Sequence, residues 1–259
     1  MSQQFYVSPE QIMKDRADFA RKGIARGRSV VVVSCAAGIA LVAENTSNSL
    51  HKIGEIYDRI AFAAVGKYNE FESLRQAGVR YADVRGYSYD RSDVTARGLA
   101  SVYAQSLGTV FTAEQKPFEV ELAVAEVGAT QAGDHIFRLT FDGSITDERS
   151  FVAMGGRSDR VTEVLRAGWR ADLALGETLR LATRALAAAT AAQDAVATGG
   201  TNEPDGGAAR VPERPEPPAP VAAVGLEVAV LDREPASWRS RRRAFRRIGQ
   251  DALQRLLEE

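Results

Sequence analysis

The chain switches several times between strand-like and helix-like patterns of apolar and polar residues. Short apolar runs rich in β-branched residues predict strands, and apolar residues at every third or fourth position predict helices. The strand-like runs lie at 29–35, 39–44, 50–56, 59–65, 119–127 and 135–141, in a further pair that ends at 151–154, and at 225–231. The helix-like stretches lie at 9–24, 67–83, 92–111, 158–195 with a break near 169–173, and 250–257.

The order of these elements predicts the fold class. After the first helix, blocks of strands are separated by pairs of helices, without the β-α-β alternation that parallel sheets require. We therefore expect an α+β fold in which two antiparallel sheets stack on each other and helices cover both outer faces. The 259 residues fit one large domain better than two.

Two segments fall outside this pattern. Ser8, Pro9 and Gln11 provide the cap, the first helical position and the capping box of a helix, so we expect a short arm at 1–8 and a domain at 9–259. Residues 198–220 are rich in Gly, Pro, Glu and Ala and have almost no large apolar residue, which predicts a disordered surface loop.

Charge and composition exclude several function classes. The formal net charge is −1, so a polyanion or an acidic membrane is not the expected main partner. Cys35 is the single cysteine and His51 and His135 are the only histidines, so we expect no disulfide framework, metal site or cofactor. The chain begins without a secretory signal pattern and has no apolar run long enough to span a bilayer, which predicts a cytoplasmic protein.

Three local features carry candidate chemistry. Lys52 lies among apolar residues in SLHKIGEI, where its stem could pack on apolar surface while the ammonium reaches water. Gly66-Lys67 lacks the spaced glycines of a phosphate-binding loop and fits a turn from strand to helix. Residues 239–247 contain six arginines, which is compatible with a nucleic-acid patch, but Phe245 and Ile248 favour an amphipathic edge strand with solvated charges.

Long collinear stretches resemble a known family. SPEQIMKDRADFARKGIAR, FDGSITDERSFVAMGG and LEVAVLDRE are among the stretches that carry the resemblance, which covers nearly everything except the very N-terminus and 198–220. The chain resembles the α subunits of the proteasome, most closely those of actinobacteria. This resemblance implies a four-layer αββα sandwich of the N-terminal-nucleophile hydrolase type. It also implies homo-heptameric α rings that cap rings of proteasome β subunits and gate the passage of proteins, including pupylated proteins of the Pup-proteasome pathway.

The residues themselves favour a subunit without catalysis. An N-terminal-nucleophile hydrolase needs a threonine, serine or cysteine freed as the first residue of its first strand, because the free amine is the base. Here a helix precedes the first strand, and cutting at Gly108-Thr109 or Gly200-Thr201 would destroy the domain. Glu44 and Lys52 fall where this fold places a carboxylate and a lysine, but they have no nucleophile to activate. A self-processed amide hydrolase and an arginine-rich nucleic-acid binder remain the alternatives.

The resemblance also implies which residues bind partners. Lys52 matches the lysine that receives the free C-terminal carboxylate of an AAA-family ring ATPase, and Gly27 and Gly66 match glycines near that pocket. The arm lacks the Tyr-Asp-Arg motif of archaeal relatives, and its low charge and apolar residues suit a plug of packed tails over the ring axis. The gate would consist of Ser2, Gln3, Gln4, Phe5, Tyr6, Val7 and Ser8.

Overall fold

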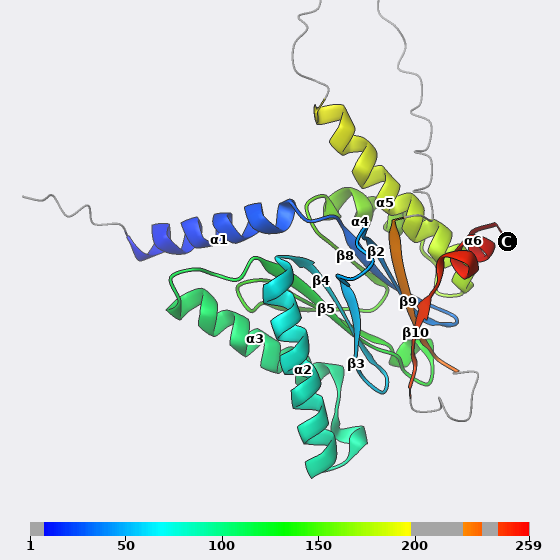
Figure 1. Ribbon diagram of the computed structural model, residues 1–259, viewed down its shortest axis with the longest axis horizontal. Helices are drawn as coiled ribbons and strands as arrows, with labels where there is room; N and C mark the ends of the chain where they lie inside the picture. Colours follow the sequence, from blue (N-terminus) through cyan, green and yellow to red (C-terminus); the bar gives the residue numbers. More distant parts are fainter. Residues whose placement is uncertain (1–7, 198–224, 235–242, 259) are drawn as a thin grey trace, which may run out of the picture.

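The structure is a computed structural model that describes residues 8–197, 225–234 and 243–258. It contains two five-stranded antiparallel sheets that stack face to face (Figure 1). The first sheet has the order β10-β9-β2-β1-β8, with bounds Phe245–Ile248, Leu226–Asp232, Gly38–Glu44, Val30–Cys35 and Phe151–Met154. The second has the order β3-β4-β5-β6-β7, with bounds Ile53–Tyr57, Ile60–Gly66, Val120–Glu126, His135–Leu139 and Ile145–Glu148.

Helices cover both outer faces of this pair of sheets. Buried residues of α2 (Tyr68–Ser88) and α3 (Ala96–Ala113) pack on the second sheet in one apolar cluster. Residues of α4 (Ser158–Gly168), α5 (Leu175–Ala197) and α6 (Gln250–Glu258) pack on the first sheet in another. A third cluster fills the space between the sheets. The predicted four-layer αββα sandwich is therefore confirmed.

The first helix, α1 (Pro9–Ala25), crosses one end of the sandwich and extends beyond it (Figure 1). Ala20 and Ile24 near its end join the core between the sheets, while its first half is exposed. Ser8 caps the helix by accepting a bond from the backbone nitrogen of Gln11 at 3.3 Å. The Gln11 side chain donates forward to Asp15 at 2.7 Å, so only the Ser8 half of the predicted capping box is observed.

Some predicted boundaries are wrong for identifiable reasons. Helix α2 continues to Ser88, past the predicted end at 83. Helix α3 begins at Ala96 because Thr95 caps it, while Ser92 belongs to a short 3₁₀ turn, η1 (Arg91–Asp93). A second such turn, η2 (Gln131–Gly133), precedes β6. The expected disorder at 198–220 and the arm up to Val7 lie outside the described residues.

Strands β7 and β8 do not pair with each other, although adjacent strand signals predicted a pair. Strand β7 pairs with β6, whereas β8 crosses to the other sheet and pairs with β1. The four residues of β8 are apolar and mostly buried, while β7 is mostly exposed. The apolar strand β8 therefore lies beside the buried strand β1, and the exposed strand β7 ends the second sheet.

A buried ion pair ties the strands together at one end of the sandwich. The Asp134 carboxylate, which is fully buried, accepts bonds from Arg233 Nη1 at 2.7 Å and Nη2 at 2.9 Å. It also accepts from Ser34 Oγ at 2.7 Å and from the Gly128 backbone nitrogen at 2.9 Å. The pair thus connects the end of β1, the segment before β6 and the segment after β9.

Candidate functional site

Lys52 lies at the opposite end of the sandwich, just before β3. Its carbonyl accepts from the backbone nitrogen of Ala64 in β4 at 3.0 Å, which continues the β3–β4 ladder by one residue. Its ammonium donates to the Arg28 carbonyl at 2.8 Å, and Arg28 leads into β1 of the other sheet. Lys52 therefore bridges the two sheets where α1 ends, and we call this region the Lys52 end.

The surroundings of Lys52 lower the pKa of its ammonium, but the side chain keeps its positive charge at neutral pH. Burial lowers the pKa of Lys52 from 10.5 to about 8, and the positive charge of Arg28 acts in the same direction. The carboxylates of Glu44 and Glu227 oppose this change in the pKa. The half-buried side chain is therefore mostly a cation at pH 7, with Arg28 O as its hydrogen-bond acceptor among the described residues.

Gly27 and Gly66 meet at the same end. A Cβ added to Gly27 would lie 3.4 Å from the Gly66 nitrogen and 2.7 Å from Val65 Cγ1. Gly66 ends β4 with a φ of +115°, and a Cβ there would lie 1.9 Å from the Glu119 carbonyl oxygen. Packing within the chain thus accounts for both glycines and confirms the turn from strand to helix at Gly66. Close approach of a partner's backbone stays a prediction.

The remaining hydrolase-like residues are held by structural contacts. The Glu44 carboxylate is buried and accepts a bond from Thr190 Oγ1 at 2.8 Å. The segment before β1 is occupied by α1 and the residues that follow it, as the sequence predicted. Thr109 lies inside α3 and donates to the Gln105 carbonyl, while 200–201 lie outside the described residues.

Sequence reasoning missed an acidic residue that bonds to several groups at this end. Strand β9 is apolar except for Glu227 and for Asp232 at its end, and a charge inside an apolar strand was the available signal. Its side chain is only 8% exposed. Its carboxylate oxygens accept bonds or pair with Lys52 N (2.8 Å), Ile53 N (3.3 Å), Asn45 Nδ2 (2.8 Å), Arg247 Nη1 (2.7 Å) and His51 Nδ1 (3.3 Å).

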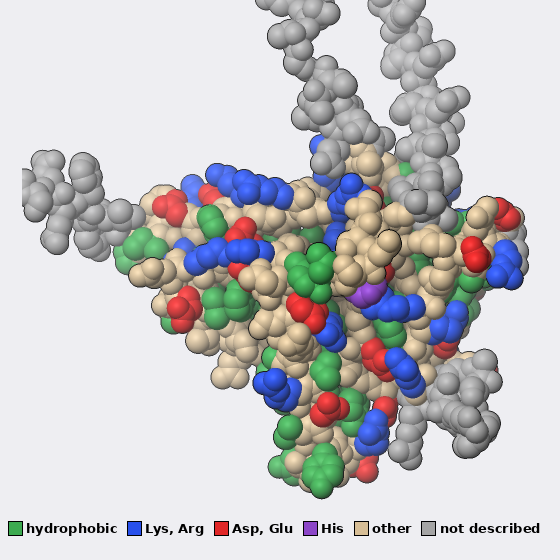
Figure 2. Space-filling model, viewed as in Figure 1, with side chains coloured by type: hydrophobic (Ala, Val, Ile, Leu, Met, Phe, Trp, Pro, Cys, Tyr) green, Lys and Arg blue, Asp and Glu red, His purple; other side chains and the backbone are tan. Residues whose placement is uncertain are grey.

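The arginine-rich segment forms ion pairs within the chain wherever the structure describes it. Strand β10 is an edge strand with Phe245 and Ile248 buried, as predicted. The three described arginines of the segment pair with acidic residues; 239–242 lie outside the described residues. Acidic and basic side chains alternate on the visible face over β3 and β10 (Figure 2). The pairs are Arg243 with Glu55, Arg246 with Asp232 and Arg247 with Glu227.

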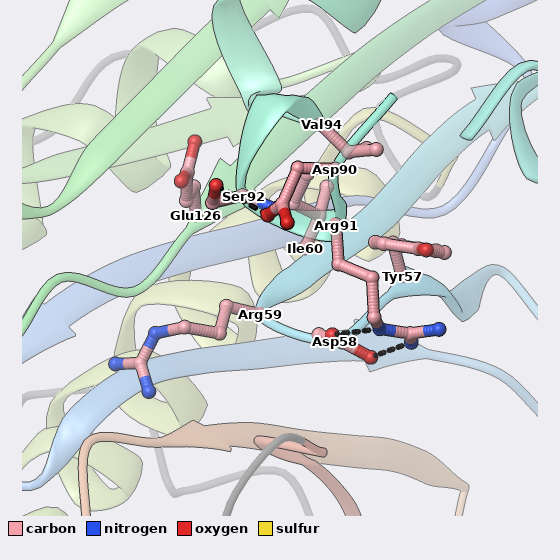
Figure 3. A pocket seen from close by; sticks show the side chains of 9 residues that line it. All are labelled: Tyr57, Asp58, Arg59, Ile60, Asp90, Arg91, Ser92, Val94 and Glu126. Atoms are coloured by element: carbon pink, nitrogen blue, oxygen red, sulfur yellow. Dashed lines mark hydrogen bonds and ion pairs between the residues drawn. The ribbon is translucent and has the colours of Figure 1, made fainter. Parts of the chain in front are cut away.

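A cavity of about 540 Å³ lies at the end away from Lys52, where β3 turns into β4 (Figure 3). Arg91 forms a double hydrogen bond with Asp58 and stacks 4.7 Å from the centre of the Tyr57 ring. The Arg59 guanidinium points away from the other labelled side chains and donates to the carbonyls of residues 127 and 128. Because these charged groups already bond to this chain, we assign no ligand to the cavity.

The described residues contain no group of three or more His, Cys, Asp or Glu side chains that could hold a metal ion. Cys35 is buried and unpaired by a disulfide. Among the helices that the structure describes, none is both long and apolar enough to cross a membrane.

Comparison with known proteins agrees with the fold. Residues 24–202 match the family model described as proteasome subunit. A protein of Pseudarthrobacter chlorophenolicus named proteasome subunit alpha is 68% identical over 99% of this chain and 100% of its own length. Proteins of the same name from Renibacterium salmoninarum and Kineococcus radiotolerans are 65% and 60% identical over 99% of this chain and 96% and 98% of their own lengths. From the four-layer sandwich, the family match and these full-length relatives, we conclude that the chain belongs to the proteasome subunit family, among its α subunits.

Proposed function

We propose that this chain is a non-catalytic α subunit that forms the outer heptameric rings of a cytoplasmic proteasome and gates the passage of substrates, including pupylated proteins. In this proposal the C-terminal tail of an AAA-family ATPase docks at Lys52 and opens the ring, and adjoining β subunits cut peptide bonds. The half-buried Lys52 ammonium is the observation that carries it. Within the described chain this cation has one hydrogen-bond acceptor, although an ammonium has three N–H donors.

A free peptide carboxylate is the ligand that suits this ammonium. Lys52 is partly desolvated, so a bond between its charge and a carboxylate is stronger than an exposed ion pair. The bond to Arg28 O holds the ammonium at the residue that follows Gly27, and Gly27 lies against Gly66. A tail that ends in an amide lacks the negative charge and would bind less well.

Replacing Lys52 with methionine is expected to uncouple the particle from the ATPase. Met keeps an apolar stem of similar length but removes the charge, so affinity for the tail should fall about 10- to 100-fold. Reconstituted particles would be assayed for ATPase-dependent degradation of a folded protein and for cleavage of a short peptide. Only the first activity should fall. Lys67→Met is the matched control, because Lys67 is half exposed and lies beside Gly66.

The same assay has an expected pH dependence. The carboxylate binds the charged form of Lys52, so binding raises the pKa of Lys52 above its free value of about 8. Tail affinity should reach its plateau well below pH 8, where the ammonium is charged and the tail carboxylate is still ionised, and should fall about tenfold per pH unit between the free and the bound pKa of Lys52. Wild-type coupling at Lys52→Met, or coupling that stays constant well above pH 8, would show that Lys52 does not bind the tail.

Two exposed apolar surfaces support assembly with other subunits. Ile12 and Phe19 on α1 border a groove of about 650 Å³ against the segment after α3. Val84, Tyr87 and Tyr89 are 61%, 92% and 75% exposed at the far tip of α2. Exposed large apolar residues in clusters mark interaction surfaces. We propose that neighbouring α subunits and β subunits cover them, and that the arm of Ser2 to Ser8, described only at Ser8, extends from α1 as the gate.

Co-expression with a β subunit tests the assembly and the absence of catalysis together. We expect stacked seven-membered rings in electron micrographs and an intact α chain in the mass spectrum, because α1 precedes β1 and leaves no terminal amine there. A chain shortened to a new N-terminal Thr, Ser or Cys would instead support a self-processed hydrolase. Separate subunits that form no rings would contradict the proposed assembly.

A further inference from the structure

Glu227 contacts the backbone of the lysine that the proposed function uses. On β9, Ala229 and Leu231 face the core between the sheets, so the alternation places Glu227 on the same side. Its Oε2 atom accepts from the Lys52 backbone nitrogen at 2.8 Å, although the two residues are 175 positions apart. A carboxylate from one sheet therefore holds the residue that comes just before the edge strand of the other.

The neighbouring residue is held by Glu227 together with Arg247. The Ile53 nitrogen donates to Glu227 Oε1 at 3.3 Å, and the Ile53 carbonyl accepts from Arg247 Nη2 at 2.7 Å. Glu227 and Arg247 also pair with each other at 2.7 Å. Since β3 is an edge strand, these two side chains take the place that a neighbouring strand would occupy at Ile53.

Glu227 also anchors the segment that leads to Lys52. Asn45, at the end of β2, donates to Glu227 Oε2 at 2.8 Å and to the Leu50 carbonyl at 2.6 Å. The segment from 45 to 52 is thus fixed at its first and last residues by one carboxylate. The lysine side chain is long and flexible, so the position of its ammonium depends on how firmly the backbone of Lys52 is held.

We propose that Glu227 is a positioning residue for Lys52: without touching the tail, it sets where the ammonium lies and helps to keep it charged. The inference rests on the proposed docking of a tail carboxylate at Lys52. Two effects are separable, since the hydrogen bonds to Lys52 N and Ile53 N set position, while the negative charge makes a contribution, smaller than that of Glu44, that favours the charged ammonium.

Three charged residues from separate parts of the chain act on the Lys52 ammonium. Glu44 at the end of β2 and Glu227 on β9 favour the ammonium, and Arg28 before β1 disfavours it. His51 and Arg247 contact the Glu227 carboxylate and not the Lys52 ammonium. Removal of the Glu227 charge leaves Glu44 as the acidic partner among these groups, so the ammonium should lose its proton at a lower pH.

The test uses assembled particles that contain Glu227→Gln, Glu227→Asp or, as the matched control, Glu55→Gln. Glu55 also lies at the β3 edge and loses an arginine partner, Arg243, but among the described residues its carboxylate bonds to Arg243 and not to Lys52. Competitive acetylation read by mass spectrometry across pH gives the titration midpoint of Lys52 without any ligand. A fluorescent peptide copying the C-terminal tail of the organism's proteasomal ATPase gives the affinity, beside the same peptide ending in an amide.

We expect Glu227→Gln to lower the Lys52 midpoint by up to about half a pH unit and to weaken carboxylate-peptide binding about three- to tenfold at the wild-type midpoint. Glu227→Asp keeps the charge but shortens the side chain, so its midpoint should stay near wild type while affinity falls. Glu55→Gln should change neither quantity. If Glu227→Gln fails to assemble, Glu227→Asp decides, because wild-type affinity there contradicts positioning.

The inference is overturned if both Glu227 variants titrate and bind the peptide as wild type does. Failure of the proposed docking has a different signature. In that case the carboxylate and amide peptides bind equally and Lys52→Met changes neither, whatever the Lys52 midpoint does in the Glu227 variants.

Discussion

Replacing Asp134 with alanine is expected to lower the free energy of unfolding by about 3–5 kcal/mol. The Asp134 side chain is fully buried and the Arg233 side chain is 10% exposed, so the substitution leaves a guanidinium without its counter-charge in a dry environment. Ser34 Oγ and the Gly128 nitrogen would also lose their acceptor. Three separate segments of the chain meet at this carboxylate, so the loss should affect the whole sandwich.

Urea unfolding followed by tryptophan fluorescence measures this effect. Trp169 donates its ring N–H to the Ser34 carbonyl, so it reports on the same region. Asp232→Ala is the control. It also removes two hydrogen bonds with an arginine, Arg246, but that arginine is half exposed, so the expected change in the free energy of unfolding is at most about 1 kcal/mol. Equal midpoints for the two variants would mean that burial of the Asp134 pair contributes nothing.

Replacing Gly66 with alanine is the second large effect, and it concerns how the Lys52 end is interpreted. The φ of +115° disfavours any side chain there, and the added Cβ would lie 1.9 Å from the Glu119 carbonyl oxygen. Strain and the displacement of β5 should together lower the free energy of unfolding by about 3 kcal/mol. Loss of ATPase coupling in this variant would therefore report a distorted strand-to-helix turn.

Gly108→Ala is the matched control for Gly66→Ala. Gly108 lies inside α3, where a Cβ would meet only the Asp142 carbonyl oxygen at an ordinary 3.5 Å. Alanine in a helix interior should raise the free energy of unfolding by about 0.5–1 kcal/mol. Thermal unfolding of both variants gives the comparison. If Gly66→Ala were as stable as wild type, the turn would tolerate a side chain and Gly66 could act through access alone.

Local patterns were sufficient for most elements. The helical spacing of Phe71, Leu74, Gly78 and Ala82 predicted the buried side of α2, and these four are the buried residues of that helix. The amphipathic pair Phe245 and Ile248 predicted β10 as an edge strand. Such predictions succeed because the period of apolar residues reflects which side of an element is buried. The Thr95 cap was missed because Ser92 and Asp93 also fit a helix start, and η1 uses them instead.

By itself, the sequence determined the α+β class, the order of the elements and the place of Lys52 near the start of a strand, although it began that strand at Leu50 and the structure begins it at Ile53. Only the tertiary structure decided the partners of the charged residues. Asp134 meets Arg233 across 99 positions, and Glu227 meets Lys52 across 175, without any local signal of either contact. Hydrophobic periodicity specifies which side of an element is buried, whereas the carboxylate that lies beside a given cation depends on which strand ends the stacked sheets bring together.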